Sequence, residues 1–444
     1  MDESVAPLND FSGGLATKAT EWMIELNQSP DIRNIDLDIK QGRLVKRKGY
    51  VKYTANTIAS ATSGIQSFYK YRKGGGTTYM LCSTLLDVYK DVSGTWTAIT
   101  AAGLSNNKKV KYATSKDKVY FVNGTNNMFN WDGTTLTDMG ATPTSPPSGC
   151  YYIASYKNRL WLARNGTYPS RVWYSALNNS DDWSTADNYG YVDIGKDDGD
   201  VIIGIVSTTD KIVIFKRYAT YALYGSPNVT DPSSFTWRQI SSDVGCINSA
   251  TIAIVENVII FLSNLGVYAL SPDNLMTKLS DHIQPTIDTI ADTTKCVAGV
   301  YKNQYWLAYY ASPSTANDSV LVLNYRLGAW VKYTGINANC FFYDKETNLF
   351  HCGSPTNGDT YTLLSGTTNN VTTLNGAIND SVTTITVVST DGFLSTGCIL
   401  IGTELITYTG VGATTFTGCT RGAYGTTKAS HLTGVDAAAT IEPS

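Results

Sequence analysis

The stretch Lys157-Asn158-Arg159-Leu160-Trp161-Leu162 places a polar turn directly before a run of strand-forming residues. The same pattern returns along the chain, with its turn residue at positions 117, 158, 210, 257, 303 and 348, or about every 45 residues. Another β run precedes each turn, as at Tyr151–Ala154, so each pair of runs predicts a hairpin. A third run follows, as at Arg171–Tyr174, and a fourth often contains Trp, as at Phe235–Arg238. The repeat therefore predicts four antiparallel strands in each unit.

Repeated four-stranded units are typical of a β-propeller, because one such sheet cannot bury both of its faces alone and stacks against its neighbours around an axis. An earlier unit at residues 64–100 brings the expected number of blades to seven, and six is the alternative. The last repeat lacks a fourth strand after Leu364, whereas Arg43–Tyr53 is strand-like and has no partner. We therefore expect the N-terminal segment to close the ring by pairing with the final blade, which would remove two open sheet edges.

The composition agrees with an all-β chain, since 29 Tyr and 9 Trp residues favour pleated, half-buried surfaces. We expect three parts: residues 1–55 as an N-terminal arm with the ring-closing strand, 56–365 as the propeller, and 366–444 as a small C-terminal β module. Within the arm, Glu21–Asn27 is predicted to form a short helix. A polar linker, Ser365–Asn370, precedes the Thr- and Gly-rich module.

The charge and cysteine patterns limit the possible partners and compartments. There are 34 Lys and Arg residues against 37 Asp and Glu, a net charge of −3, which is too balanced to indicate nucleic acid or an anionic membrane as the main partner. No apolar stretch long enough to span a membrane and no secretion signal are present, so we expect the chain to stay in the cytosol or to leave by lysis. The 8 Cys residues lack metal-ligand spacing and are expected to be buried free thiols.

The sequence predicts no catalytic, cofactor-binding or metal-binding residues, and hence no enzyme and no cofactor. His282, His351 and His431 lie in separate regions, without a second ligand at metal-binding spacing. A propeller glycosidase is the best enzymatic alternative, because two suitably spaced carboxylates would suffice. Its candidate carboxylates are Asp91, near a partial match to the Asp-box of sialidases, and the groups Asp181-Asp182 and Asp197-Asp198 with Asp200. We interpret these acidic groups as solvated loops.

Short motifs at both ends resemble proteins of bacteriophage virions. Asp10–Leu15 (Asp-Phe-Ser-Gly-Gly-Leu), Ile32-Arg33-Asn34 and Gly42–Tyr50 resemble the opening of tail proteins from tailed phages. Gly418–Thr426, with His431 downstream, resembles a segment of phage virion proteins. The resemblance is to the tail nozzle, or stopper, family of short-tailed phages, whose members are β-propellers that assemble as a ring below the head-to-tail adaptor.

This resemblance implies a structural component of the virion tail, assembled in the host cytoplasm as a homo-oligomeric ring, with a hexamer expected. Its partners would be the head-to-tail adaptor, tail spike or fibre proteins, and double-stranded DNA that passes through the exit channel and is retained and then released. Candidate gating loops are Tyr168–Arg171 and Lys196–Asp200. The alternative is a receptor-binding or fibre-type tail protein whose C-terminal module contacts host glycans.

Overall fold

The structure is a computed structural model, and it divides the chain into two compact units. One unit comprises residues 1–45 and 53–360, and the other comprises residues 46–52 and 361–444. The structure describes residues 10, 12–20, 22–37, 45–54, 56–99, 104, 109–142, 144–185, 188–225, 235–365, 371–390, 393 and 396–440. The predicted linker lies mostly at 366–370, outside the described residues.

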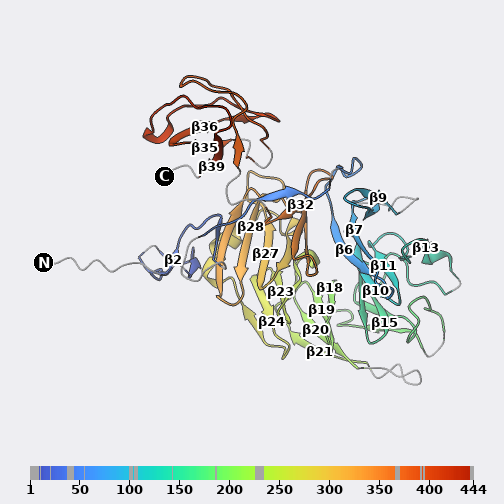
Figure 1. The fold of residues 1–444 in the computed structure, drawn as a ribbon. Coiled ribbons are helices and arrows are strands. Elements are labelled where there is room, and N and C mark those ends of the chain that lie inside the picture. The colour runs from blue at the N-terminus through green and yellow to red at the C-terminus, as the bar shows by residue number, and fades with distance from the viewer. Residues whose placement is uncertain are drawn as a thin grey trace. The chain divides into compact units, whose positions relative to one another are not determined.

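The larger unit is a β-propeller, as the repeat predicted (Figure 1). Six consecutive four-stranded antiparallel sheets follow one another in chain order. Blades 1 to 3 contain β6 (Ser67–Arg72), β7 (Thr78–Ser83), β8 (Val88–Asp91) and β9 (Trp96–Ala98); β10 (Lys111–Ser115), β11 (Lys118–Val122), β12 (Phe129–Trp131) and β13 (Leu136–Asp138); and β14 (Tyr152–Tyr156), β15 (Arg159–Ala163), β16 (Arg171–Tyr174) and β17 (Gly190–Asp193).

Blades 4 to 6 repeat this arrangement, and a seventh repeat follows them. Their strands are β18 (Ile202–Ser207), β19 (Ile212–Lys216), β20 (Thr220–Tyr224) and β21 (Thr236–Ser241); β22 (Ala253–Val255), β23 (Val258–Ser263), β24 (Gly266–Leu270) and β25 (Met276–Lys278); and β26 (Val297–Tyr301), β27 (Gln304–Tyr309), β28 (Ser319–Asn324) and β29 (Ala329–Thr334). The seventh repeat contains the hairpin of β30 (Cys340–Asp344) and β31 (Leu349–Gly353), followed by β32 (Thr360–Leu363). Strand β32 pairs antiparallel with β5 (Tyr50–Lys52), which comes from the N-terminal segment.

The propeller closes into a ring because its first and last blades contact each other. The first strand of each blade contacts the first strand of the next blade or, between blades 4 and 5, the short helical segment that precedes that strand. Strand β30 of the seventh repeat contacts β6 of blade 1. Across this junction Lys70 Nζ lies 2.7 Å from Asp344 Oδ2, and the Asn339 side-chain amide donates to the Ile65 carbonyl at 2.9 Å. The Asn248 amide similarly donates to the Cys296 carbonyl at 2.8 Å, which links blade 5 to blade 6. Buried backbone groups between the sheets are thus satisfied by side chains of the neighbouring blade.

Adjacent sheets share apolar cores. One core joins Tyr71 and Leu81 of blade 1 to Phe121 and Trp131 of blade 2, and another joins the strands of blades 3 and 4 around Trp161. A further core combines the start of blade 1 with Cys340 of the seventh repeat. This packing is the reason for the repeat, since each sheet buries one face against each neighbour.

The repeated polar pairs form tight hairpin turns. Lys157 and Asn158 have φ values of 50° and 59°, and Glu256 and Asn257 have values of 49° and 70°. Positive φ at both central residues is the geometry of the type I′ turn, whose twist matches that of the flanking strands. The cysteine prediction is also confirmed, because all eight thiols are free and buried.

The N-terminal arm packs on blade 6. Strand β1 (Gly14–Leu15) pairs in parallel with β2 (Gln28–Ser29) and lies against β29, and β3 (Ile35–Asp36) and β4 (Val45–Lys46) follow. Gly14 has φ +71° and a Cβ there would lie 2.5 Å from the Trp330 carbonyl oxygen, so only glycine fits. The predicted helix at 21–27 is wrong: residues 22–27 form turns instead. A helix of two turns without tertiary packing does not repay its nucleation cost.

The smaller unit contains the C-terminal β module. One sheet has the order β33-β39-β35-β36, formed by Val371–Thr373, Asp436–Thr440, Gly397–Ile401 and Glu404–Tyr408. A second sheet has the order β34-β38-β37, formed by Ile385–Thr386, Thr415–Thr417 and Gly410–Val411. Their apolar side chains meet in one core around Ile399, Ile406 and Phe416. Among the described residues the helical elements are short: α1 (Gln284–Asp288), η1 (Met139–Ala141), η3 (Ser249–Thr251), η4 (Asp281–Ile283), η5 (Thr293–Lys295) and η6 (Ala423–Gly425).

Candidate functional site

The acidic residues considered for glycoside hydrolysis serve local structure. Asp91 accepts hydrogen bonds from the Tyr53 hydroxyl at 2.8 Å and from the Gly94 amide at 2.8 Å in the β8–β9 turn. Asp198 lies 2.6 Å from Nζ of Lys216, whose side chain is completely buried. Asp91 and Asp198 therefore belong to different blades and are held by different partners.

The Asp181-Asp182 pair is likewise divided between two structural roles. Asp181 accepts from Lys118 Nζ at 2.7 Å and from the Tyr120 hydroxyl at 2.9 Å, which ties its loop to blade 2. Asp182 accepts from the Ser184 and Thr185 amides and stabilises a turn. These hydrogen bonds lower the pKa of Asp182 despite the opposing effect of burial. Asp182 therefore does not have the raised pKa of a general acid.

The three histidines occupy unrelated environments. The His282 carbonyl accepts hydrogen bonds from Thr17 and Lys18 of the arm. His351 packs edge-on against Tyr53 with 4.5 Å between ring centroids, and burial lowers its pKa to about 4. His431 belongs to the C-terminal module. Within the part of the chain that the structure describes, no three His, Cys, Asp or Glu side chains are grouped so that they could hold a metal ion.

The motif Gly418–Thr426 encloses a buried ionic cluster in the C-terminal module. The Glu404 side chain is 0% exposed and accepts hydrogen bonds from Arg421 Nε at 2.9 Å and from Arg421 Nη2 at 2.7 Å. His431 Nε2 lies 2.8 Å from the same carboxylate. The Gly422 and Ala429 amides donate to it as well. These hydrogen bonds outweigh burial and lower the Glu404 pKa to about 2. The motif residues thus pin two loops to a central carboxylate, a role that the sequence reasoning missed because Glu404 lies outside the motif.

The predicted loop Tyr168–Arg171 lines an aromatic pocket of about 630 Å³ beside blade 3. The Arg171 guanidinium lies 4.1 Å from the Tyr168 ring centroid and 3.6 Å from that of Tyr191, and it forms a two-point ion pair with Asp193. The stacked guanidinium holds both tyrosine rings in place. The residues that line the pocket are Ser145, Pro146, Pro147, Tyr168, Arg171, Trp173, Trp183, Tyr189, Gly190 and Tyr191. We call this cavity the blade-3 pocket.

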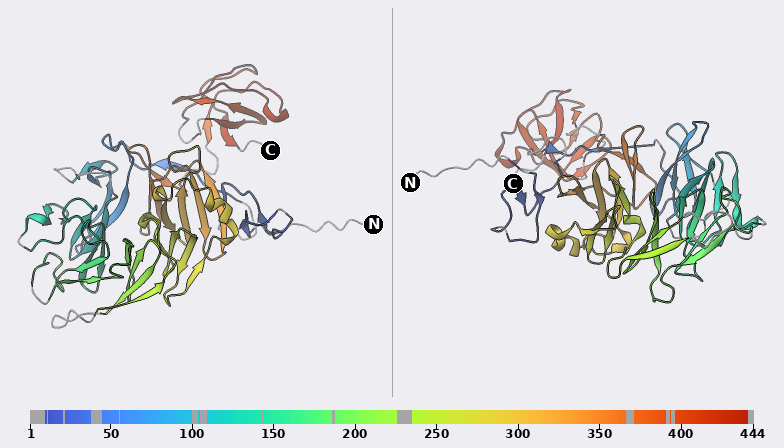
Figure 2. Two further views of the ribbon diagram at one scale, coloured as in Figure 1. Left: turned by 180° about the vertical axis from the view of Figure 1, so that it is seen from behind. Right: turned by 90° about the horizontal axis from the view of Figure 1, so that it is seen from below.

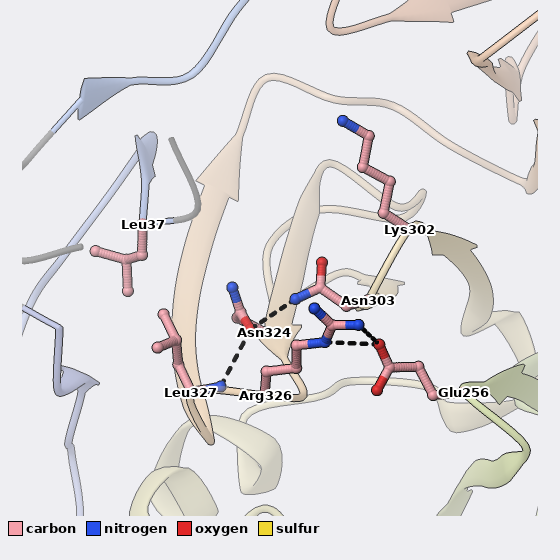
Figure 3. Close-up of a pocket in the computed structure, with 7 residues that line it drawn as sticks. All are labelled: Leu37, Glu256, Lys302, Asn303, Asn324, Arg326 and Leu327. Carbon is pink, nitrogen blue, oxygen red and sulfur yellow. Dashed lines mark hydrogen bonds and ion pairs between the residues drawn. The ribbon is translucent and has the colours of Figure 1, made fainter. Parts of the chain in front are cut away.

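A second pocket, of about 560 Å³, lies where the hairpin turns of blades 5 and 6 approach the arm (Figure 3). Arg326 Nε donates to Glu256 Oε1 at 2.7 Å, and the Asn303 amide donates to Asn324 Oδ1 at 3.0 Å. Leu37 contributes the wall formed by the arm. Glu256 and Arg326 are paired with each other, whereas the Lys302 side chain points away from them and lies over the Tyr301 ring (Figure 3).

The central channel of the propeller holds two lysines. Lys109 Nζ donates to the Asn339 carbonyl at 2.6 Å, and Lys111 follows on β10. Burial lowers the pKa of each ammonium to about 8. The cavity here measures about 170 Å³.

These features define the protein as a β-propeller with an aromatic surface pocket and an attached β module. Similar solved structures include Ycf48 bound to a D1 peptide (TM-score 0.45, 10% identity, covering 71% of this chain and 99% of that chain) and the extracellular domain of BT4673 from B. thetaiotaomicron (TM-score 0.46, 10% identity, 82% and 46%). The computationally designed Ika8 protein is also similar (TM-score 0.43, 9% identity, 71% and 99%). The likeness concerns the fold alone.

No protein-family model and no curated protein sequence matches this chain. Among the described residues, no helix is long and apolar enough to cross a membrane.

Proposed function

We propose that this protein is a structural, non-enzymatic subunit of a phage tail, of the nozzle or stopper type. In this role identical chains form a ring, with a hexamer expected, around the path of the exiting genome. The ring binds the head-to-tail adaptor and carries tail spike or fibre proteins. It is assembled in the host cytoplasm and becomes part of the virion.

The observation that carries the proposal is that one residue in each of the first two arm motifs has a defined position on the propeller. Gly14 of the first motif fits directly against the Trp330 carbonyl. Asn34 of the second has φ 57°, donates to Thr334 Oγ1 at 2.9 Å and accepts from the Thr334 amide at 3.0 Å. Because each position requires that residue type, the motifs are a structural signature of an arm docked on a propeller, which supports the resemblance to tail proteins.

The charge and the channel dimensions are consistent with this role. Since the cavity between the first strands of the blades measures only about 170 Å³, DNA would pass through the pore between subunits. A net charge of −3 provides few cationic contacts to phosphate, which would otherwise retard the passage of DNA. The loop Lys196–Asp200 remains a candidate for the pore lining, whereas Tyr168 and Arg171 line the blade-3 pocket.

The experiment is negative-stain microscopy of the purified full chain, alone and mixed with the adaptor of the same phage. We expect closed rings with a central hole wide enough for duplex DNA, seated on the adaptor. Monomers that persist in both samples would refute the proposal. The alternative receptor-binding role is tested by comparing host-cell binding of the full chain with that of a chain ending at residue 365: loss of cell binding with intact ring formation would favour the receptor role.

A further inference from the structure

The N-terminal arm carries an exposed apolar tip. Trp22, Met23 and Leu26 are 96%, 78% and 86% exposed, so one loop presents three large apolar side chains to solvent. We call these three residues the arm tip. Apolar groups clustered in this way on a soluble chain mark a surface that binds a partner.

The arm tip is held in position by its base. The loop between β1 and β2 is closed by hydrogen bonds from Gly13 to Asn27 at 3.0 Å and from Ala16 to Ser29 at 2.9 Å. Inside the loop, the Met23 amide donates to the Thr20 carbonyl at 2.8 Å. A loop anchored at both ends loses less conformational entropy when it binds. The tip is therefore a preorganised projection rather than a loose tail.

The blade-3 pocket has the complementary chemistry. Tyr168, Tyr189 and Tyr191 at its rim are 43%, 40% and 55% exposed, whereas Trp173 and Trp183 are buried in its wall. Its volume of about 630 Å³ lies within the usual range of about 300–1,000 Å³ for sites that enclose a compact ligand. Aromatic walls of this kind bind aromatic and thioether side chains such as those of Trp and Met.

The charges of the two surfaces are also compatible. Arg171 is the charged residue among those that line the pocket within the described part of the chain. The arm sequence between Lys18 and Arg33 contains Glu21, Glu25 and Asp31 and no cation. The acidic tip would therefore approach a pocket whose described lining contains one cation, Arg171, which is paired with Asp193, and no anion, so no like charges oppose the contact.

The two surfaces cannot meet within one molecule. The arm packs on β29 of blade 6, whereas the pocket is built on β16 and β17 of blade 3, three blades away in the ring. Figures 1 and 2 show β2 and the strands around β13 and β15 at opposite sides of the propeller. A projection and a complementary pocket on different faces of one chain produce a head-to-tail contact, which generates a ring if the rotation closes.

We infer that the arm tip of one chain inserts into the blade-3 pocket of a second copy and that this heterologous contact joins neighbouring subunits. Trp22 and Met23 are the anchors, and Tyr168, Tyr189 and Tyr191 close around them. The inference rests on the proposed association of chains into a ring, and it names the surfaces that make the contact.

The test uses full-length variants and measures their mass in solution by analytical ultracentrifugation. The tip variant carries Trp22→Ser, Met23→Ser and Leu26→Ser, and the pocket variant carries Tyr189→Ser and Tyr191→Ser. The control variant carries Leu275→Ser and Leu432→Ser, which replace side chains that are 67% and 74% exposed elsewhere. Intrinsic tryptophan fluorescence during urea unfolding checks that each variant is folded.

We expect the wild type and the control to form the same oligomer, and each single-surface variant to weaken association by about 30-fold or more, the loss given by one hot-spot residue. The decisive sample is a mixture of the tip and pocket variants. Each retains the half-site that the other lacks, so the mixture should form dimers that neither forms alone. Failure of the mixture to dimerise, or an unchanged oligomer in either variant, would overturn the inference.

These outcomes are separable from the proposed function. If both variants still form the ring, the tip–pocket contact is refuted, whereas the proposed tail role stands. A folded wild type that stays monomeric at its highest soluble concentration overturns the contact, while binding of the chain to the adaptor decides the tail role independently.

Discussion

Replacement of Arg421 by Met should selectively destabilise the C-terminal module. The substitution keeps an unbranched apolar stem but removes the guanidinium and with it both donors to Glu404, whose carboxylate is 0% exposed and cannot recruit bulk water. The Asn379 and Ala429 carbonyls lose their guanidinium donors as well. Breaking a buried ion pair on one side costs about 3–5 kcal/mol, because it leaves the partner charge uncompensated.

The pKa of Glu404 gives an independent value of similar size. Its pKa falls from an ordinary 4.5 to about 2 in the folded protein, and a difference of roughly 2.5 units corresponds to ~3 kcal/mol. The sign follows from the lowered pKa: this stabilisation is complete above pH 4.5 and is lost as the pH falls toward 2. Between pH 4.5 and 2, the stability of the C-terminal module should therefore depend less on pH in the Arg421→Met chain than in the wild type.

The assay is hydrogen exchange of the amides in β35, β36 and β38, which gives the free energy of opening of the module. Tryptophan fluorescence supplies the internal control, because all 9 Trp residues lie at or before Trp330 and report on the other unit. The urea midpoint of the fluorescence transition should not change in the variant.

A double variant, Glu404→Leu with Arg421→Met, tests the cause. Since an apolar pair of similar volume is often neutral relative to a buried ion pair, the double variant should recover at least half of the lost free energy. A single variant that costs less than about 1 kcal/mol, or a double variant no more stable than the single one, would refute the reasoning.

Four other predictions concern the propeller. Gly14→Ala should weaken the docking of the arm on the propeller by about 1–3 kcal/mol, because the new Cβ would clash with the Trp330 carbonyl oxygen. The arm should then be cleaved faster by protease, and cleavage at the wild-type rate would contradict the packing. Asn339→Leu should lower propeller stability by about 1–3 kcal/mol in urea unfolding, because the Ile65 carbonyl loses its donor. The buried neutral His351, with a pKa of about 4, contributes stability above pH 6.5 that declines by ~3 kcal/mol as the pH falls to 4, so His351→Phe should flatten this part of the stability profile. Asp91→Asn and Asp197→Asn should not alter the turnover of sialosides or polysaccharides, which should be absent in the wild type; measurable turnover lost in either variant would reopen the glycosidase alternative.

The repeat was predictable because it is local. In turns such as Lys157-Asn158 a polar pair between two apolar runs adopts positive φ values that Asn and Asp tolerate, so the pair indicates a hairpin without any tertiary information. Gly14 illustrates the limit: the sequence shows a glycine turn, but its approach to Trp330 joins segments separated by more than 300 residues. The helix predicted at 21–27 failed for the same reason, since the exposed Trp22, Met23 and Leu26 have no surface of their own chain to cover.

The sequence alone determined that this chain is a propeller of four-stranded blades, because strand length, turn chemistry and apolar alternation are properties of neighbouring residues. Only the tertiary structure decided which side chains act together: Glu404 with Arg421 and His431, and Arg171 between two tyrosines. It also left Trp22, Met23 and Leu26 of the arm exposed, three blades away from the aromatic pocket. Such groupings depend on how distant blades and loops meet, and contact between residues far apart in the chain leaves no periodic signal in the sequence.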